Sequence, residues 1–180
     1  MKLRRRDLLA ASLGVPALAR AGTQDGFTFT LQNGSGQLVT PAQFRGRYLL
    51  VFFGYTRCTD TCPITLYRLA WALRAIDPDN KIFAALFITI DPAHDSPQNT
   101  ARYAANISPR IQGLSGSPAQ IAQAIAAFHV YVTWPNGPQG APDHSALVYL
   151  LAPTGELASV LPDNLSTAAL IRLLQPYSQP

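Results

Sequence analysis

The most constraining feature of the sequence is a continuous apolar run, Tyr48–Phe53, which ends at Gly54. Soon after it, the apolar residues take on helical spacing. An apolar run with no polar alternation predicts a central strand that is buried on both faces. Apolar residues then recur at three- and four-residue intervals until Asp77, which predicts a helix that begins near Pro63. A second apolar run, 81–90, predicts another buried strand. The order strand, helix, strand favours an α/β fold.

The rest of the sequence continues this alternation. Ser96 and Ser117 each precede a proline, which predicts capped helices that reach about Asn106 and Ala127. The other predicted elements are a hairpin over 27–39, an extended stretch over 130–133, strands over 146–151 and 156–161 with a turn at 153–155, and a closing helix over 166–174. We therefore expect a three-layer α/β sandwich with a mixed central β-sheet and an N-terminal β-hairpin.

Residues 1–21 have the layout of a signal peptide. A basic cluster that includes Arg5 and Arg6 precedes an apolar run of 12 residues, Leu8–Ala19, and small residues mark a cleavage site that ends at Ala21. The run is shorter than the roughly 20 residues that a membrane-spanning helix needs, which favours cleavage over a retained membrane anchor. The paired arginines resemble a twin-arginine signal, with a general secretory signal as the alternative. We expect residues 22–180 to form a soluble periplasmic domain.

The leader also accounts for the excess of positive charge. The sequence has 14 Lys+Arg and 10 Asp+Glu, and residues 1–21 hold five of the former and one of the latter. Nine of each remain after residue 21, so the pI of about 9.3 does not support a nucleic-acid partner or an anionic membrane surface. Hydrophobic residues make up 48% and charged residues only 13%, which indicates one compact domain.

The two cysteines, Cys58 and Cys62, lie where the first buried strand passes to the helix. Ligands commonly bind there, because loop residues at the carboxyl end of a strand are exposed yet firmly held. The spacing puts both sulfurs on one face of a helix, and the helix start favours the thiolate over the thiol. Two thiolates are soft ligands that select Cu(I), and one imidazole would complete a three-coordinate site, whereas zinc would normally need a fourth ligand.

Three histidines compete for the role of third ligand. His129 ends an apolar helical run and is typical of a surface or structural histidine. His94 follows a strand end, but two flanking carboxylates make it as good a solvated turn residue as a ligand. His144 lies between a proline-rich loop and a strand, beside Asp143, where a sheet of this kind presents a residue to the thiols. His144 is therefore the best third ligand.

Three blocks of the sequence resemble the Sco/SenC copper-binding proteins, which assist assembly of cytochrome c oxidase. Segment 53–63, FGYTRCTDTCP, is similar to the family signature FGYTxCxxxCP, and segment 88–97, ITIDPAHDSP, resembles the SVDPxxDTP block. Segment 143–145 resembles the DH(S/T) strand entry. With the early hairpin, the resemblance extends over roughly residues 25–176. Arg57 and Thr59 depart from the pattern, because His and Pro often occupy these positions.

The resemblance implies a thioredoxin-like fold and a copper chaperone that takes part in assembly of the CuA site. Cys58, Cys62 and His144 match the family's ligands for one copper per chain, as Cu(I) or Cu(II). Asp91 and Asp95 match acidic positions with a supporting role. The implied partner is cytochrome c oxidase subunit II, through its CuA domain, and a second periplasmic copper chaperone remains open as the donor.

Two alternatives use the same sulfurs. A plain disulfide between Cys58 and Cys62 would close a gap of only three residues, so it would stabilise the fold little and serve better as a reversible redox couple. A thiol-disulfide oxidoreductase that reduces the CuA-site cysteines would use both residues as catalytic groups. Apart from this thiol-disulfide activity, the chain is not expected to be a classical enzyme. His144 separates the two functions, since thiol exchange needs no imidazole in contact with both sulfurs.

Overall fold

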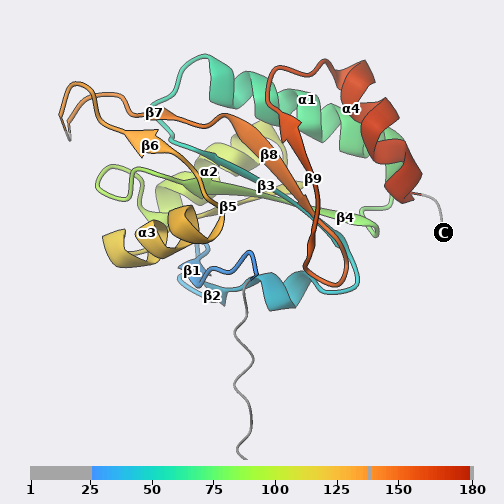
Figure 1. Cartoon of the computed structure of the whole chain (residues 1–180), viewed down its shortest axis with the longest axis horizontal. Coiled ribbons are helices and arrows are strands. Elements are labelled where there is room, and N and C mark those ends of the chain that lie inside the picture. The colour runs from blue at the N-terminus through green and yellow to red at the C-terminus, as the bar shows by residue number, and fades with distance from the viewer. Residues whose placement is uncertain (1–25, 138, 179–180) are drawn as a thin grey trace, which may run out of the picture.

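The computed structural model describes residues 26–137 and 139–178, so the predicted leader lies outside the described residues (Figure 1). A five-stranded sheet with the order β5-β4-β3-β8-β9 forms the centre. The strands are β1 (Leu31–Gln32), β2 (Leu38–Val39), β3 (Tyr48–Gly54), β4 (Phe83–Thr89), β5 (Ile111–Leu114), β6 (Val132–Thr133), β7 (Asp143–His144), β8 (Leu147–Leu151) and β9 (Leu157–Pro162). The helices are α1 (Thr61–Ile76), α2 (Pro97–Ile107), α3 (Pro118–Ala127) and α4 (Thr167–Leu174), with short 3₁₀ turns η1 (Pro41–Phe44) and η2 (Gln175–Ser178).

The pairing of β3 determines where loops can meet. β3 runs parallel to β4, with Val51 opposite Leu86, and antiparallel to β8, with Val51 opposite Tyr149. β4 in turn pairs in parallel with β5, and β8 pairs antiparallel with β9. The sheet is therefore mixed, as predicted. The loops that follow β3 and β4 leave the same edge of the sheet.

Alternate side chains of the central strand face opposite layers. Leu50 and Phe52 pack with residues of α1, α2 and α4 on one face. Leu49, Val51 and Phe53 pack with α3 and the segment that carries β1 and β2 on the other (Figure 1). All five side chains are at most 2% exposed. This period of two produces the three layers of the predicted thioredoxin-like sandwich.

Serine caps start three of the helices where the sequence predicts them. The Ser96 and Ser166 side chains each accept a backbone N–H of the first turn of α2 and α4. Ser117 and Gln120 form a reciprocal capping box at the start of α3. Helix α1 differs, because the side chain of its N-terminal flanking residue, Asp60, makes no capping hydrogen bond within the described structure.

The observed strands differ from the predicted ones at three places. The predicted N-terminal hairpin is present, but its first strand is shorter than expected, because β1 pairs with β2 only at Leu31–Gln32. Strand β5 was not predicted, because it is only four residues long and contains Gly113. A Cβ on Gly113 would clash with the carbonyl oxygen of Thr100, so α2 packs directly on this strand. Strand β7 was also missed, because its two residues are ordered by pairing with β6.

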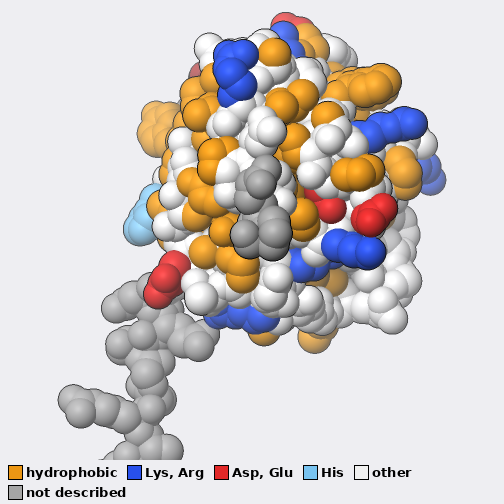
Figure 2. All heavy atoms as spheres, turned by 90° about the vertical axis from the view of Figure 1, so that its right-hand side faces the viewer, with side chains coloured by type: hydrophobic (Ala, Val, Ile, Leu, Met, Phe, Trp, Pro, Cys, Tyr) orange, Lys and Arg blue, Asp and Glu red, His pale blue; other side chains and the backbone are white. Residues whose placement is uncertain are grey.

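Two further features of the structure are the lengths of its helices and the charges on one of its faces. No helix within residues 26–137 and 139–178 is long and apolar enough to cross a bilayer. On the face drawn in Figure 2, Lys and Arg side chains are spread among hydrophobic and acidic ones and are not gathered into one patch. This face agrees with the equal numbers of acidic and basic residues after the leader.

Candidate metal centre

Cys58 and Cys62 lie at the start of α1, directly after β3. Cys62 belongs to the first turn of the helix, and its backbone N–H donates to the Cys58 sulfur over 3.4 Å. The Cys58 sulfur therefore takes the place of the missing side-chain cap. Both cysteines are free thiols, with Cys58 partly exposed and Cys62 fully buried. One sulfur thus faces the surface, and the other faces the core.

The environment of Cys62 is apolar and tightly packed. A Cβ added to Gly54 would lie 2.8 Å from the Cys62 sulfur and 2.9 Å from the ring of Phe87, so only glycine leaves room for the thiol. Burial raises the pKa of Cys62, and the neighbouring Cys58 adds to the effect. The expectation that the helix start favours a thiolate is therefore wrong for this residue, because desolvation raises its pKa more than the backbone hydrogen bond at Tyr55 lowers it.

His144 lies on β7, opposite Val132 of β6. Its Nδ1 is 3.1 Å from the backbone carbonyl oxygen of Ser145. Since a carbonyl oxygen only accepts, Nδ1 donates the proton and Nε2 keeps its lone pair. The imidazole stands edge-on to the rings of Phe52 and Tyr55, with centroid distances of 6.5 and 6.2 Å. Nε2 is thus the atom of this residue that is suited to bind a metal.

Tyr55 links His144 to the cysteines. Burial raises the pKa of its phenol, and the nearby Cys58 and Cys62 raise it further, so this side chain is near both sulfurs as well as the imidazole. The three predicted ligands therefore lie in one neighbourhood. Within the part of the chain that the structure describes, however, no three His, Cys, Asp or Glu side chains come close enough to hold a metal ion. The three-ligand set stays a prediction.

Asp95 supports the segment that leads to the cysteines. Its carboxylate is fully buried and accepts the backbone N–H of Thr56 at 2.9 Å and the hydroxyl of Thr89 at 2.6 Å. The Thr56 hydroxyl donates to the other carboxylate oxygen. Asp95 thereby joins the end of β4 to the residue that lies two positions before Cys58.

Asp91 holds a second set of polar contacts. Its buried carboxylate accepts from the guanidinium of Arg57 at 2.8 Å and from Nδ1 of His94 at 2.8 Å. Nε2 of His94 lies 3.2 Å from the side-chain oxygen of Gln139. His94 therefore belongs to a polar cluster beside Cys58, and no contact places it with the two sulfurs. His129 lies in the left-handed region with φ of 53° and is exposed.

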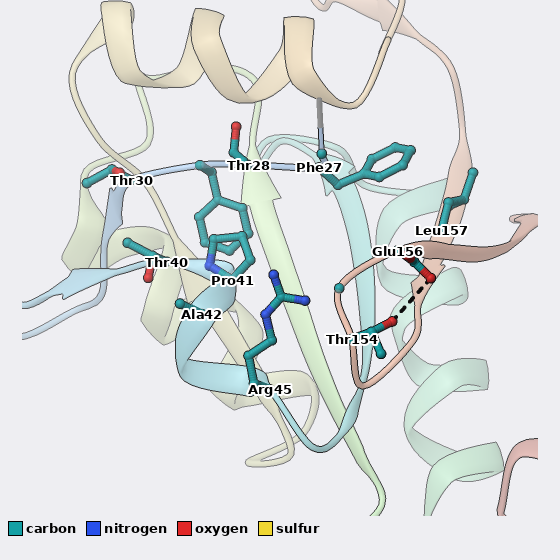
Figure 3. A pocket seen from close by; sticks show the side chains of 13 residues that line it. Phe27, Thr28, Thr30, Thr40, Pro41, Ala42, Arg45, Thr154, Glu156 and Leu157 are labelled. Atoms are coloured by element: carbon teal, nitrogen blue, oxygen red, sulfur yellow. Dashed lines mark hydrogen bonds between the residues drawn. The ribbon is translucent and has the colours of Figure 1, made fainter. Parts of the chain in front are cut away.

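A hollow of about 860 Å³ lies away from the cysteines (Figure 3). It is bounded by residues 26–30, 40–45 and 154–157, and the Arg45 side chain reaches into it. The turn at 153–155 adjoins the start of β3, since Leu151 pairs with Leu49, whereas Cys58 follows the end of β3. The hollow and the thiols thus lie at opposite ends of the strand.

Comparison with known proteins decides the family. A family model described as SCO1/SenC matches residues 19–179. The chain belongs to the SCO1/SenC family. Protein sco1 of Schizosaccharomyces pombe is 34% identical over 97% of this chain and 66% of its own length. Protein SenC of Rhodobacter capsulatus is 35% identical over 74% of this chain and 61% of its own length. The chain thus spans less than two thirds of these SCO1/SenC relatives.

Solved structures of SCO1/SenC proteins have the same fold. Bradyrhizobium japonicum ScoI with copper bound is 35% identical, with a TM-score of 0.74 over 84% of this chain and 98% of that one. Arabidopsis thaliana ScoI with copper bound is 28% identical, with a TM-score of 0.78 over 84% of this chain and 96% of that one. The predicted fold class and family resemblance are therefore confirmed.

The sequence did not reveal which partners the acidic residues of this SCO1/SenC chain have. Asp91 and Asp95 were given only an unspecified supporting role, and Thr56 and Gln139 were not singled out. A signal existed, because acidic residues after one parallel strand lie near the loop that follows its neighbour. The pairing partner of each carboxylate depends on loop conformations that the sequence pattern does not determine.

Proposed function

We propose that this chain is a copper chaperone that holds one copper ion with Cys58, Cys62 and His144 and delivers it to the CuA site of cytochrome c oxidase. The observation that carries the proposal is the pair of thiols at the start of α1, with the lone pair of His144 Nε2 in the same neighbourhood. Support comes from family membership and from two relatives whose structures contain copper. Copper is the cargo of this function.

The set of donor atoms fits Cu(I) better than it fits divalent ions such as zinc. Two thiol sulfurs and one imidazole nitrogen are soft to borderline ligands, which suit Cu(I) in a three-coordinate site. Binding has to displace the proton of Cys62, whose pKa burial raises, so copper uptake should release protons to the buffer. Phe52 and Phe87 are fully buried on the core side of the cysteines, where they would keep water and oxidants away from bound Cu(I).

Copper coordination by all three residues requires His144 to approach the sulfurs. His144 belongs to the two-stranded sheet β6–β7, which is separate from the five-stranded sheet that carries the cysteines. A small adjustment at His144 therefore breaks no ladder of the central sheet. We propose that copper draws the His144 side chain toward Cys58 and Cys62, with the ring of Tyr55 adjusting between them.

Copper titration of the purified chain tests the ligands. We expect one Cu(I) per chain, and strong sulfur-to-copper charge transfer in the Cu(II) form. His144→Ala should weaken Cu(I) binding in a chelator competition by about 10- to 100-fold and change the absorption spectrum. His129→Asn is the matched control, because asparagine tolerates the left-handed backbone of this exposed histidine. Equal affinity and unchanged spectra in His144→Ala would contradict the three-ligand site.

Delivery is tested with a copper-free CuA domain of subunit II as acceptor. The domain is first reduced and then mixed with the Cu(I)-loaded chain, and copper transfer is followed by the metal content of each protein after separation. The chaperone function is supported if copper moves from the loaded chain to the acceptor and if the Cys58→Ser variant transfers none. Retention of all copper on the donor would contradict delivery to this acceptor.

One observation favours a second function at the same site. Cys58 is partly exposed and Cys62 is buried, which is the usual arrangement of an attacking and a resolving thiol. The two thiols would form a disulfide while the acceptor disulfide gains two electrons and two protons as a dithiol. If the oxidised CuA domain is reduced quickly and receives no metal, this oxidoreductase function replaces the chaperone.

We propose a periplasmic location, with residues 1–21 as the cleaved export signal. The support is the arrangement of basic, apolar and small residues in the leader. Sequencing the N-terminus of protein recovered from the periplasmic fraction should show a chain that begins near residue 22. Recovery of the uncleaved chain from membranes would favour a retained anchor.

A further inference from the structure

Arg57 joins three segments that are far apart in the sequence. Its guanidinium donates to the carboxylate of Asp91 at 2.8 Å and to the backbone carbonyl oxygens of Gln139 and Gly140 at 3.4 and 3.3 Å. Asp91 follows β4, the two carbonyls belong to the loop between β6 and β7, and Arg57 itself precedes Cys58. The cysteine loop, the β4 loop and the β6–β7 loop therefore meet at one side chain.

His94 makes a second link between two of these segments. Its Nδ1 lies 2.8 Å from Asp91, and its Nε2 lies 3.2 Å from the side-chain oxygen of Gln139. The Asp91 carboxylate and the Gln139 side-chain oxygen are acceptors, so the ring donates to both when it carries two protons. The hydrogen bond with Asp91, and then the one with Gln139, raises the pKa of His94, while Arg57 at 3.2 Å lowers it. The contact with Gln139 ties the β6–β7 loop to the loop that follows β4.

Asp91 anchors both cations. Its side chain is only 1% exposed, and a buried carboxylate without partners is costly. The carboxylate therefore orients Arg57 and His94 and leaves their remaining donors for Gln139 and Gly140. Within the described residues, these contacts connect the β6–β7 loop to the loop of the cysteines.

The loop held in this way leads directly to His144. Three residues separate Gln139 from β7, the strand that contains His144. Strand β7 pairs with β6 and shares no ladder with the central sheet. We infer that Arg57 and His94, both anchored on Asp91, are positioning residues that hold the 139–140 turn and so determine where His144 lies relative to the two sulfurs. The inference rests on the proposed ligand role of His144 and goes beyond it.

Hydrogen exchange of the copper-free, reduced chain tests the contacts alone. Arg57→Gln should raise the exchange rates of backbone amides within 139–144 several-fold, and Arg57→Lys, which can still pair with Asp91, should restore part of the protection. Arg68→Gln is the matched control, because Arg68 lies on α1 and donates a hydrogen bond of 3.4 Å to the carbonyl oxygen of Asn164, away from the 139–140 turn. Unchanged exchange in Arg57→Gln would overturn the inference, whether or not the chain binds copper.

A double-mutant cycle tests whether Arg57 acts through His144. Loss of a residue that orients a metal ligand typically costs 10- to 100-fold in affinity, so Arg57→Gln should weaken Cu(I) binding by about 10-fold. If Arg57 acts through His144, the double variant Arg57→Gln/His144→Ala binds no more weakly than His144→Ala alone. An additive loss would overturn the inference, because Arg57 would then act on the sulfurs directly.

The two experiments separate this inference from the proposed function. A chain that binds no copper refutes the chaperone, while the exchange rates still decide whether Arg57 holds the loop. A chain that binds copper with equal affinity in Arg57→Gln supports the chaperone and overturns the positioning role. Arg68→Gln should stay within about twofold of the unmodified chain in every copper measurement, since surface substitutions distant from a site have small effects.

Discussion

Asp95→Ala should destabilise the chain more than the loss of any exposed carboxylate. The substitution removes the acceptor of the Thr56 N–H, the Thr56 hydroxyl and the Thr89 hydroxyl, of which the last is fully buried. An unsatisfied buried donor costs about 1–3 kcal/mol, and the partly exposed Thr56 can recover some of this with water. We expect a loss of roughly 3–5 kcal/mol in the free energy of unfolding, or about 10 °C in Tm for a domain of this size.

Urea unfolding of the reduced, copper-free chain, followed by far-UV circular dichroism, measures the loss. Asp79→Ala is the control, because this exposed carboxylate pairs only with the exposed Lys81 at 3.4 Å and should contribute less than about 0.5 kcal/mol. If Asp95→Ala does not fold, Asp95→Asn keeps one acceptor oxygen and should lose about half as much. A loss below about 1 kcal/mol in Asp95→Ala would refute the view that this carboxylate holds the cysteine loop in place.

Two further predictions concern the cysteine pocket and the polar cluster. Gly54→Ala should displace the Cys62 sulfur, lower the free energy of unfolding by about 1–3 kcal/mol and weaken Cu(I) binding. The control Gly26→Ala, where a Cβ meets open space, should have none of these effects. Equal copper affinity in the two variants would contradict the packing argument. Because pairing with Asp91 raises the pKa of His94, the stability that this contact adds is complete below about pH 6.5 and is lost as the pH rises through the raised pKa. NMR titration should show His94 titrating above its ordinary value and Asp91→Asn lowering that pKa, and an ordinary value in the unmodified chain would exclude the pairing.

The sequence predicted the fold wherever a single period was long enough. The apolar run at Tyr48–Phe53 and the serine caps before α2, α3 and α4 are local signals, and each produced an element close to its predicted position. Strands β5 and β7 were not predicted, because strands of two to four residues are ordered by pairing with their neighbours and are too short to show a periodic pattern. The stretch 27–30 alternates like a strand but has no neighbour with which to pair.

The three proposed ligands come from the sequence and their role stays a prediction, whereas their interactions could not be predicted. The strand-to-helix junction placed Cys58 and Cys62 together, and the ring of His144 lies 6.2 Å from that of Tyr55, three positions before Cys58. The pKa of Cys62 could not be predicted, because desolvation depends on Gly54 and Phe87, which come from two different strands. Thr56 and Arg57, which pair with the acidic residues after β4, come from a loop more than 30 residues earlier in the sequence.

The division of the site between two sheets also affects how such a protein can change over evolution. The thiols follow β3, a strand of the central sheet with six of its seven residues buried, whereas the imidazole lies on the two-stranded sheet β6–β7. We therefore expect insertions, deletions and substitutions in the 134–142 loop to alter copper affinity without disturbing the core. A library confined to that loop should yield copper affinities over a wide range at nearly constant fold stability, which makes the loop the natural place to retune this domain for another acceptor.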